Sequence, residues 1–353
     1  MENSFFIYTE KNNTIQVERF HICSWEFNNN SSLVEFGFEI SKESIKNDNL
    51  TVFIFIPWVE KSCETKDLYE KLSLAENSRF IFNDSISATK YLKPNSSNPG
   101  VIHTFSGRNE LCVIPAILKI DEDKIVTATL NLKAYNEYNQ ESKPNIYFRF
   151  WIKPSVPFIS MRKKGVSKST IIYDIKVNER RNIPDNRIDY FNTQELCKIK
   201  YCFSFNILPN KYDIVFFDNT SLKNVRTLEY ESFNKYLGDK RVKKDELIVV
   251  FNKKQDSESF SFFSIYSMER IGPGQFALAI LINIFCGVLL FLPAFRKSFE
   301  PELPFTKIWS NLPIEIFLAL GVALATLFYF ILPTIQNSYN KLFDMFNNKK
   351  GKK

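Results

Sequence analysis

The sequence contains few of the residues that most enzymes use in their active sites. Its 353 residues include only ten glycines and two histidines, His21 and His103. Neither histidine has the spacing of zinc ligands, and the patterns GxxxxGK[ST], HExxH, GxSxG and GxGxxG are absent. The small number of glycines also argues against a phosphate-cradling loop of the usual kind. We therefore expect a protein that is not an enzyme and holds no metal or cofactor.

The chain also lacks paired cysteines and an export signal. The first residues, MENSFFIYTEKNN, have neither a basic start nor a long apolar run. No CxxC pair or regular disulfide framework is formed by the six cysteines: Cys23, Cys63, Cys112, Cys197, Cys202 and Cys286. Free thiols in a reducing compartment are the expected state.

An excess of basic residues over the whole chain is also missing. The net charge is +7, and residues 271–353 hold eight basic and four acidic residues, hence +4. That leaves +3 for the first 270 residues, which are nearly balanced. A polybasic nucleic-acid coat is therefore excluded.

The first 270 residues are rich in strand patterns. Residues 51–58, TVFIFIPW, form a continuous apolar run, and residues 145–153, NIYFRFWIK, alternate aromatic with polar or charged residues. Clusters of Pro, Asn, Gly and Ser separate such runs, which predicts an antiparallel, β-sandwich-like region that is mainly β. A soft boundary in 154–157 gives a β-rich domain over 1–155, and 156–270 is a second domain or a continuation of the first.

Helices are expected at only a few places in this region. The best candidate is the stretch 64–77, ETKDLYEKLSLAEN, and weaker ones are 192–198 and 228–238.

Two stretches near the C-terminus have almost no charge. Residues 276–295 contain no charged residue, and residues 316–332 are also apolar. A helix of about 20 residues spans the hydrocarbon layer of a membrane, about 30 Å thick. The expected organisation of the C-terminal part is a transmembrane helix at 275–295, an external loop at 296–311, a second transmembrane helix at 312–335 and a basic cytoplasmic tail at 336–353.

Flanking charges set the expected orientation of this hairpin. Basic residues favour the cytoplasmic side, and the tail carries Lys341, Lys349, Lys350, Lys352 and Lys353. The expected location is the inner (plasma) membrane, with several crossings and both termini in the cytoplasm. The lipid bilayer would then be a binding partner.

Small and polar residues recur on the faces of the two expected helices. Residues spaced by four share one helix face, and small residues let helices approach closely. One interpretation is a hairpin that packs on itself, and the other is a homo-oligomer that lines or closes a pore. The residues concerned are Ala279, Asn283 and Gly287 in the first helix, and Glu315, Gly321 and Ala325 in the second.

A basic stretch in the β-rich region is the candidate ligand site. MRKKGVSKS, residues 161–169, predicts a glycine-containing turn between two strands. Clustered Arg and Lys with hydroxyl groups at such a turn could hold phosphates, although a solvated hairpin tip would look the same. The candidate residues are Arg162, Lys163, Lys164, Lys168, Arg180 and Arg181.

In overall architecture the chain resembles the membrane effectors of bacterial anti-phage defence. Hailong-type effectors and the two-helix effectors of cyclic-oligonucleotide systems similarly join a sensor domain to a membrane module. The resemblance covers the whole chain, but no diagnostic motif carries it and no residue role can be transferred. It implies a sensor of a small oligonucleotide messenger, a nucleotidyltransferase partner that makes the messenger, and an oligomeric pore that depolarises the inner membrane. The alternative is a membrane-anchored protein-interaction module without channel activity.

Overall fold

The computed structural model describes most of the chain up to residue 298 and a few residues beyond it. The chain divides into two compact units: Met1–Lys164 with Thr170–Met268, and Gly165–Ser169 with Glu269–Lys353. The described residues are 3–11, 13–28, 31–93, 99–138, 143–154, 159–165, 168–218, 220–244, 247–255, 257–269, 273–298, 312–314, 316–321 and 323–325.

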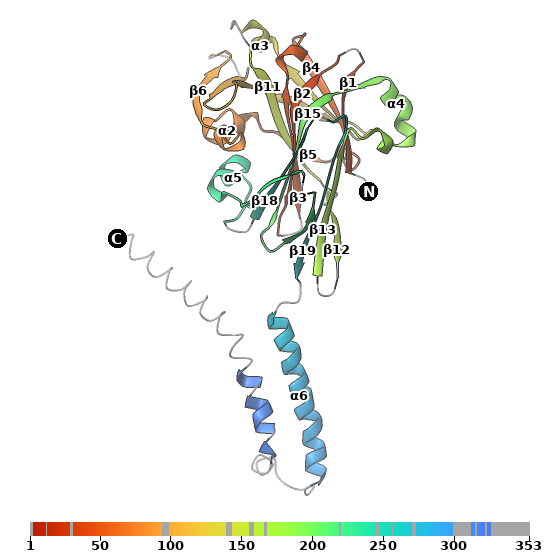
Figure 1. The fold of residues 1–353 in the computed structure, drawn as a ribbon, viewed down its shortest axis with the longest axis vertical. Helices are drawn as coiled ribbons and strands as arrows, with labels where there is room; N and C mark the ends of the chain where they lie inside the picture. Colours follow the sequence, from red (N-terminus) through yellow and green to blue (C-terminus); the bar gives the residue numbers. More distant parts are fainter. Residues whose placement is uncertain are drawn as a thin grey trace, which may run out of the picture. The chain divides into compact units, whose positions relative to one another are not determined.

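The first unit consists of two β-sheets packed face to face (Figure 1). The first sheet has nine strands among the described residues, and the shortest two lie off its main path, β12 on β13 and β14 on β1. In spatial order its main strands are β16 (Asp213–Phe217), β19 (Phe260–Glu269), β13 (Lys168–Val177), β1 (Asn3–Glu10), β4 (Asn49–Phe55), β10 (Ile125–Asn131) and β9 (Ala116–Ile120), with β12 (Met161–Lys164) and β14 (Gln194–Leu196) added.

The second sheet has ten described strands, of which β5 pairs with β11 off the main path. In spatial order the main strands are β17 (Leu222–Thr227), β18 (Leu247–Gln255), β15 (Lys198–Pro209), β2 (Gln16–Glu26), β3 (Ser32–Ile40), β11 (Asn145–Lys153), β8 (Leu111–Val113), β7 (Val101–Phe105) and β6 (Ile86–Tyr91), with β5 (Glu64–Asp67) added.

Apolar side chains from both sheets fill the space between them. Phe5 of β1 meets Phe36 of β3 edge to face at 5.5 Å, and Phe38 stacks on Phe148 of β11 at 4.7 Å. These residues are fully buried, as the period-2 pattern of a strand with one face on a core requires.

Short helices cover part of the outer face of each sheet. On the second sheet, α1 (Tyr69–Leu72), α2 (Ala75–Ile81) and α5 (Tyr230–Leu237) pack on an apolar cluster around Trp25. On the first sheet, Phe191 of α4 (Ile188–Asn192) packs on Phe6 and Phe55. The remaining short helices are α3 (Lys133–Glu137), η1 (Lys42–Ser44), η2 (Arg180–Asn182) and η3 (Asp185–Arg187).

The expectation of a mainly β region is confirmed, but the expected all-antiparallel pairing is wrong. Parallel pairs are formed by β1 with β13, by β2 with β15, and by β8 with β11. Parallel neighbours need a crossover connection rather than a hairpin, and a sequence of separate strand patterns does not show which runs become neighbours. The soft boundary in 154–157 falls within one compact unit.

The second unit contains the long helix α6 (Pro273–Ser298). Ala279, Asn283 and Gly287 all lie exposed on α6, as do Gly321 and Ala325 in the described helical pieces between 314 and 325. A Cβ atom added at Gly287 or Gly321 would meet nothing within 4 Å. Glu315 lies outside the described residues. Packing of these positions between copies of the chain stays a prediction.

The predicted transmembrane hairpin is wrong. Throughout the part of the chain that the structure describes, no helix combines the length and the apolar character needed to cross a membrane. The predicted inner-membrane location with cytoplasmic termini fails for the same reason. The predicted tail, 336–353, lies outside the described residues.

Candidate functional site

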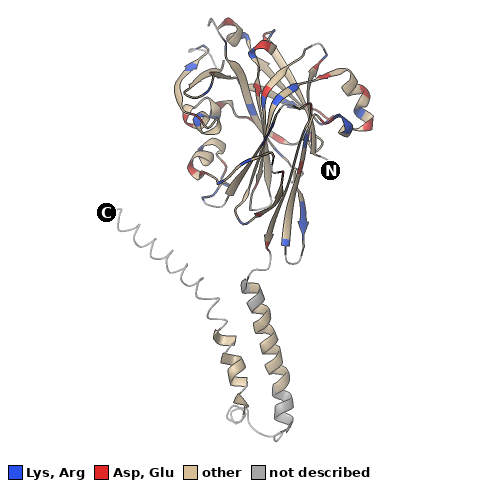
Figure 2. Ribbon diagram, viewed as in Figure 1, with Lys and Arg blue, Asp and Glu red and all other residues tan. Residues whose placement is uncertain are grey.

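Arg162, the first residue of the predicted basic site, is bound to a buried carboxylate. It lies on β12 and forms an ion pair with Glu26 of β2, which also accepts a hydrogen bond from Ser160. Only 1 % of Glu26 is exposed, so this arginine compensates a charge inside the protein. The neighbouring Lys163 and Lys164 are exposed, and β12 is drawn blue in Figure 2.

The other predicted residues lie at both ends of β13. Lys168 is the first residue of this ten-residue strand, whereas Arg180 and Arg181 follow its last residue, Val177. A strand rises by about 3.3 Å per residue, so Lys168 at one end of β13 and the two arginines after its other end are about 30 Å apart. Arg181 is also paired with Glu179 at 2.5 Å. The structure therefore does not bring the six residues together.

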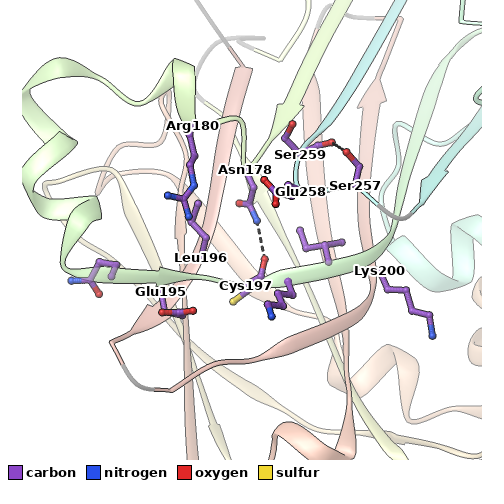
Figure 3. A pocket seen from close by; sticks show the side chains of 12 residues that line it. Asn178, Arg180, Glu195, Leu196, Cys197, Lys200, Ser257, Glu258 and Ser259 are labelled. Atoms are coloured by element: carbon purple, nitrogen blue, oxygen red, sulfur yellow. Dashed lines mark hydrogen bonds between the residues drawn. The ribbon is translucent and has the colours of Figure 1, made fainter.

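Arg180 lines a separate cavity of about 640 Å³ (Figure 3). One wall comes from β14 and the start of β15, where the amide of Asn178 donates to the carbonyl oxygen of Cys197 at 3.1 Å. Lys198 and Lys200 add positive charge, but Glu195 and Glu258 also line the cavity. These carboxylates offset most of the attraction for an anion.

A third place is the strongest candidate. It is a cavity of about 370 Å³ on the outer face of the second sheet, beside the helices that cover part of that face. We call it the Arg19 cavity. Strands β2, β15, β18 and β17, the end of α2 and the loop after β7 supply its lining: Arg19, His21, Phe80, Ile81, Phe82, Asn83, Arg108, Phe203, Phe205, Lys223, Asn224, Arg226, Val249 and Phe251.

The charged side chains in this lining are all cationic. Arg108 and Arg19 share the carboxylate of Glu39, at 2.9 and 3.5 Å, and Arg226 lies 3.5 Å from Glu229. Four cations against these two carboxylates leave a local charge of +2. Lys223 is exposed and has no carboxylate within ion-pair distance among the described residues. The cavity is therefore electropositive, and among its described cations Lys223 is the one without a carboxylate partner.

Half-buried aromatic rings form the floor of the Arg19 cavity. Phe251 of β18 stacks on Phe205 of β15 at 4.7 Å and on Phe203 at 5.8 Å. The guanidinium of Arg108 lies 5.1 Å from the ring centre of Phe82. Aromatic surface beside cations suits a flat organic anion, because the ring can stack or pack while the charge is paired.

Sequence reasoning missed this site because its residues are scattered from 19 to 251. Two local signals were present. Tyr201, Phe203 and Phe205 alternate along β15, and so do Arg19 and His21 along β2, which puts each set on one face of its strand. The parallel pairing of β2 with β15 then brings the two sets side by side.

No family model matches this chain, and no curated protein matches it in sequence. Among the described residues, no group of three or more His, Cys, Asp or Glu side chains is placed to hold a metal ion.

Proposed function

We propose that the two-sheet unit is a binding domain for a small anionic ligand that carries a flat ring, such as a nucleotide, and that the Arg19 cavity holds it. One observation carries the proposal: every charged side chain in the lining is cationic, and the floor beside them is aromatic. Phosphate pairs with Arg and Lys, and a base packs on aromatic rings. The volume, about 370 Å³, lies in the range of small-molecule sites.

This proposal keeps the predicted ligand class but moves its site. The loop 161–169 is set aside because Arg162 is committed to Glu26 and because Arg180 and Arg181 lie at the far end of β13. Two parts of the expected function stay predictions from the resemblance in architecture. One is that the ligand is an oligonucleotide messenger made by a nucleotidyltransferase, and the other is that the protein acts in antiviral defence.

A second candidate function is a protein-interaction module. It is favoured by an apolar patch at the edge of the first sheet, where Val215 and Phe216 of β16 are 61 % and 50 % exposed and Phe263 of β19 is 40 % exposed. Exposed apolar residues on an edge strand are typical of surfaces that meet another chain.

Replacing Lys223 and Arg226 together with alanine should weaken ligand binding about ten- to hundredfold. A hydrogen bond to a charged group contributes about 1.5–3 kcal/mol, and exposure of both residues places the effect toward the lower end. Calorimetric titration of the full chain with adenosine monophosphate, inosine monophosphate and inorganic phosphate measures it.

The matched control is Arg180→Ala with Lys198→Ala, which removes two exposed cations from the cavity in Figure 3. This variant should bind like the wild type. If the control loses binding and the first variant keeps it, the site is the Arg180 cavity. If none of the three probes binds the wild type, the proposed function is wrong and the interaction module becomes the better candidate.

A further inference from the structure

His21 is the one uncharged hydrogen-bonding ring in the Arg19 cavity. It lies on β2 with its ring 4.9 Å from that of Phe203, nearly edge to face. Its Nδ1 atom is 3.0 Å from the hydroxyl of Tyr147 on β11. The imidazole makes no other hydrogen bond among the described residues. Its Nε2 atom is also not enclosed as a buried atom without a partner would be. Nε2 is thus the ring atom left for a ligand.

The position of the imidazole proton follows from the groups behind Tyr147. The Nη1 atom of Arg149 lies 3.5 Å from the Tyr147 hydroxyl oxygen, and an arginine can only donate. The hydroxyl therefore accepts from Arg149 and has its own proton to give. Among the described residues, His21 Nδ1 is the acceptor within reach of that proton. The tyrosine donates to Nδ1, which places the imidazole proton on Nε2.

Arg149 is itself fixed by a buried carboxylate. Its Nε donates to Glu35 at 2.7 Å, and its Nη2 lies 2.5 Å from the same oxygen. Glu35 also accepts from Trp25 at 2.7 Å and from Tyr236 of α5 at 2.9 Å. Because Glu35 is fully buried, this ion pair keeps the guanidinium beside Tyr147.

Gly37 provides the room that this arrangement needs. A Cβ atom there would clash with the hydroxyl oxygen of Tyr147 and would lie 3.1 Å from its Cζ atom. The hydroxyl therefore occupies space that any other residue at this position would fill. The absence of a side chain at Gly37 therefore leaves the hydroxyl room to reach the imidazole of His21.

The imidazole is held in its neutral form. Burial lowers the pKa of His21 well below its ordinary value, and the charges of Arg149, Arg19 and Arg108 lower it further. Lys223 and Arg226 add positive charge around the same cavity, and Glu39 is already paired with Arg19 and Arg108. The ring thus keeps one proton at neutral pH.

We infer that His21 determines the specificity of the Arg19 cavity: Tyr147 and Arg149 fix its Nε2–H as a donor, so the site takes a ligand with a hydrogen-bond acceptor at that point. A phosphate oxygen and an acceptor atom of a base share this chemistry. A ligand group that can only donate, such as an ammonium, is rejected because two donors would face each other. This inference rests on the proposed function.

Nitrogen-15 NMR of the full chain labelled at histidine tests the fixed proton without any ligand. The chain has two histidines, so His103→Gln assigns both signals. We expect the wild-type His21 to show a proton-bearing Nε2 and a bare Nδ1, with no titration through pH about 6.5, the ordinary His pKa. Tyr147→Phe should shift both nitrogens toward an average of the two tautomers. A proton on Nδ1 in the wild type would overturn the inference even if nucleotides bind.

Binding of adenosine monophosphate, adenosine and inorganic phosphate then tests the donor role. We expect His21→Leu to weaken binding of any probe that carries the accepting group about tenfold. Tyr147→Phe should weaken the same binding only a few fold, because part of the His21 population in that variant keeps its proton on Nε2. A loss confined to phosphate-bearing probes identifies an oxyanion as the acceptor, and a loss shared with adenosine identifies the base. Unchanged affinity in His21→Leu refutes the donor role and leaves the proposed function standing. If no probe binds the wild type, both fail.

Discussion

Replacing Arg149 with methionine should lower the free energy of unfolding by about 3–5 kcal/mol, the usual cost of removing one partner of a buried ion pair. Glu35 would keep only the neutral donors Trp25 and Tyr236 while remaining fully buried. A carboxylate left in that position is poorly solvated and has no opposite charge beside it. Urea unfolding followed by tryptophan fluorescence measures the change, since Trp25 itself donates to Glu35.

The double variant Glu35→Gln with Arg149→Met is the control. It removes the buried charge along with its partner, so it should be more stable than Arg149→Met alone, and the two substitutions should not be additive. A cost below about 1 kcal/mol for Arg149→Met would mean that the pair is not buried in the folded protein as described, because such values are typical of exposed pairs.

Replacing Arg162 with methionine should cost about 3 kcal/mol of stability and leave ligand binding unchanged. Its partner Glu26 is 1 % exposed and would keep only hydrogen bonds from neutral groups such as Ser160. The sequence suggests the opposite outcome, a loss of ligand affinity with little change in stability. Thermal or urea unfolding and nucleotide titration of the same full-chain variant separate the two.

The stability of the Arg162→Met variant should also fall as the pH rises from acid to neutral. Burial raises the pKa of Glu26 above its ordinary value, and Arg162 is the main group that lowers it. Without Arg162 the folded-state pKa rises further. When the pKa of a carboxyl is higher in the folded than in the unfolded protein, the carboxyl stabilises the fold fully below its unfolded pKa, about 4.3. That stability is lost as the pH rises through the folded pKa. The variant should therefore be closest to the wild type in acid and weakest at neutral pH.

Lys163→Met is the matched control for Arg162→Met. Lys163 is the next residue on β12 and is exposed, so its replacement should change stability by no more than about 0.5 kcal/mol. If Arg162→Met folds as stably as this control but no longer binds nucleotide, then the basic loop is the site after all and the Arg19 cavity is not.

Local pattern predicted some strands well, such as residues 145–153, which form β11, but some helices only in part. Residues 228–238 were expected to be helical, and α5 occupies Tyr230–Leu237. Residues 64–77 were expected to be one helix, yet they begin with β5, whose Glu64–Asp67 pair with β11. The helix-forming residues there are overridden by pairing with a strand about 80 residues away, which a local propensity cannot register.

The site was less predictable than the fold for a physical reason. A basic cluster such as residues 161–169 is visible because its charges are neighbours in sequence, but neighbours in sequence can point to different partners, as Arg162 and Lys163 do. In the Arg19 cavity, the cations of β2 and β17 become neighbours only through the pairing of β2 with β15, of β15 with β18 and of β18 with β17. Strand order and register are set by the whole core, so the cavity could not be found from composition.

The parallel pairing of β1 with β13 and of β2 with β15 has a consequence for the order of folding. These contacts join the first 26 residues to strands that begin at Lys168 and Lys198. Contacts of such long sequence separation form slowly, because a large loop must close before they add stability. During synthesis on the ribosome, one edge of β1 and one edge of β2 stay without their partner strands until about 200 residues have been made. A chain cut near residue 155 would keep those edges exposed, and aggregation rather than a folded half is the expected product.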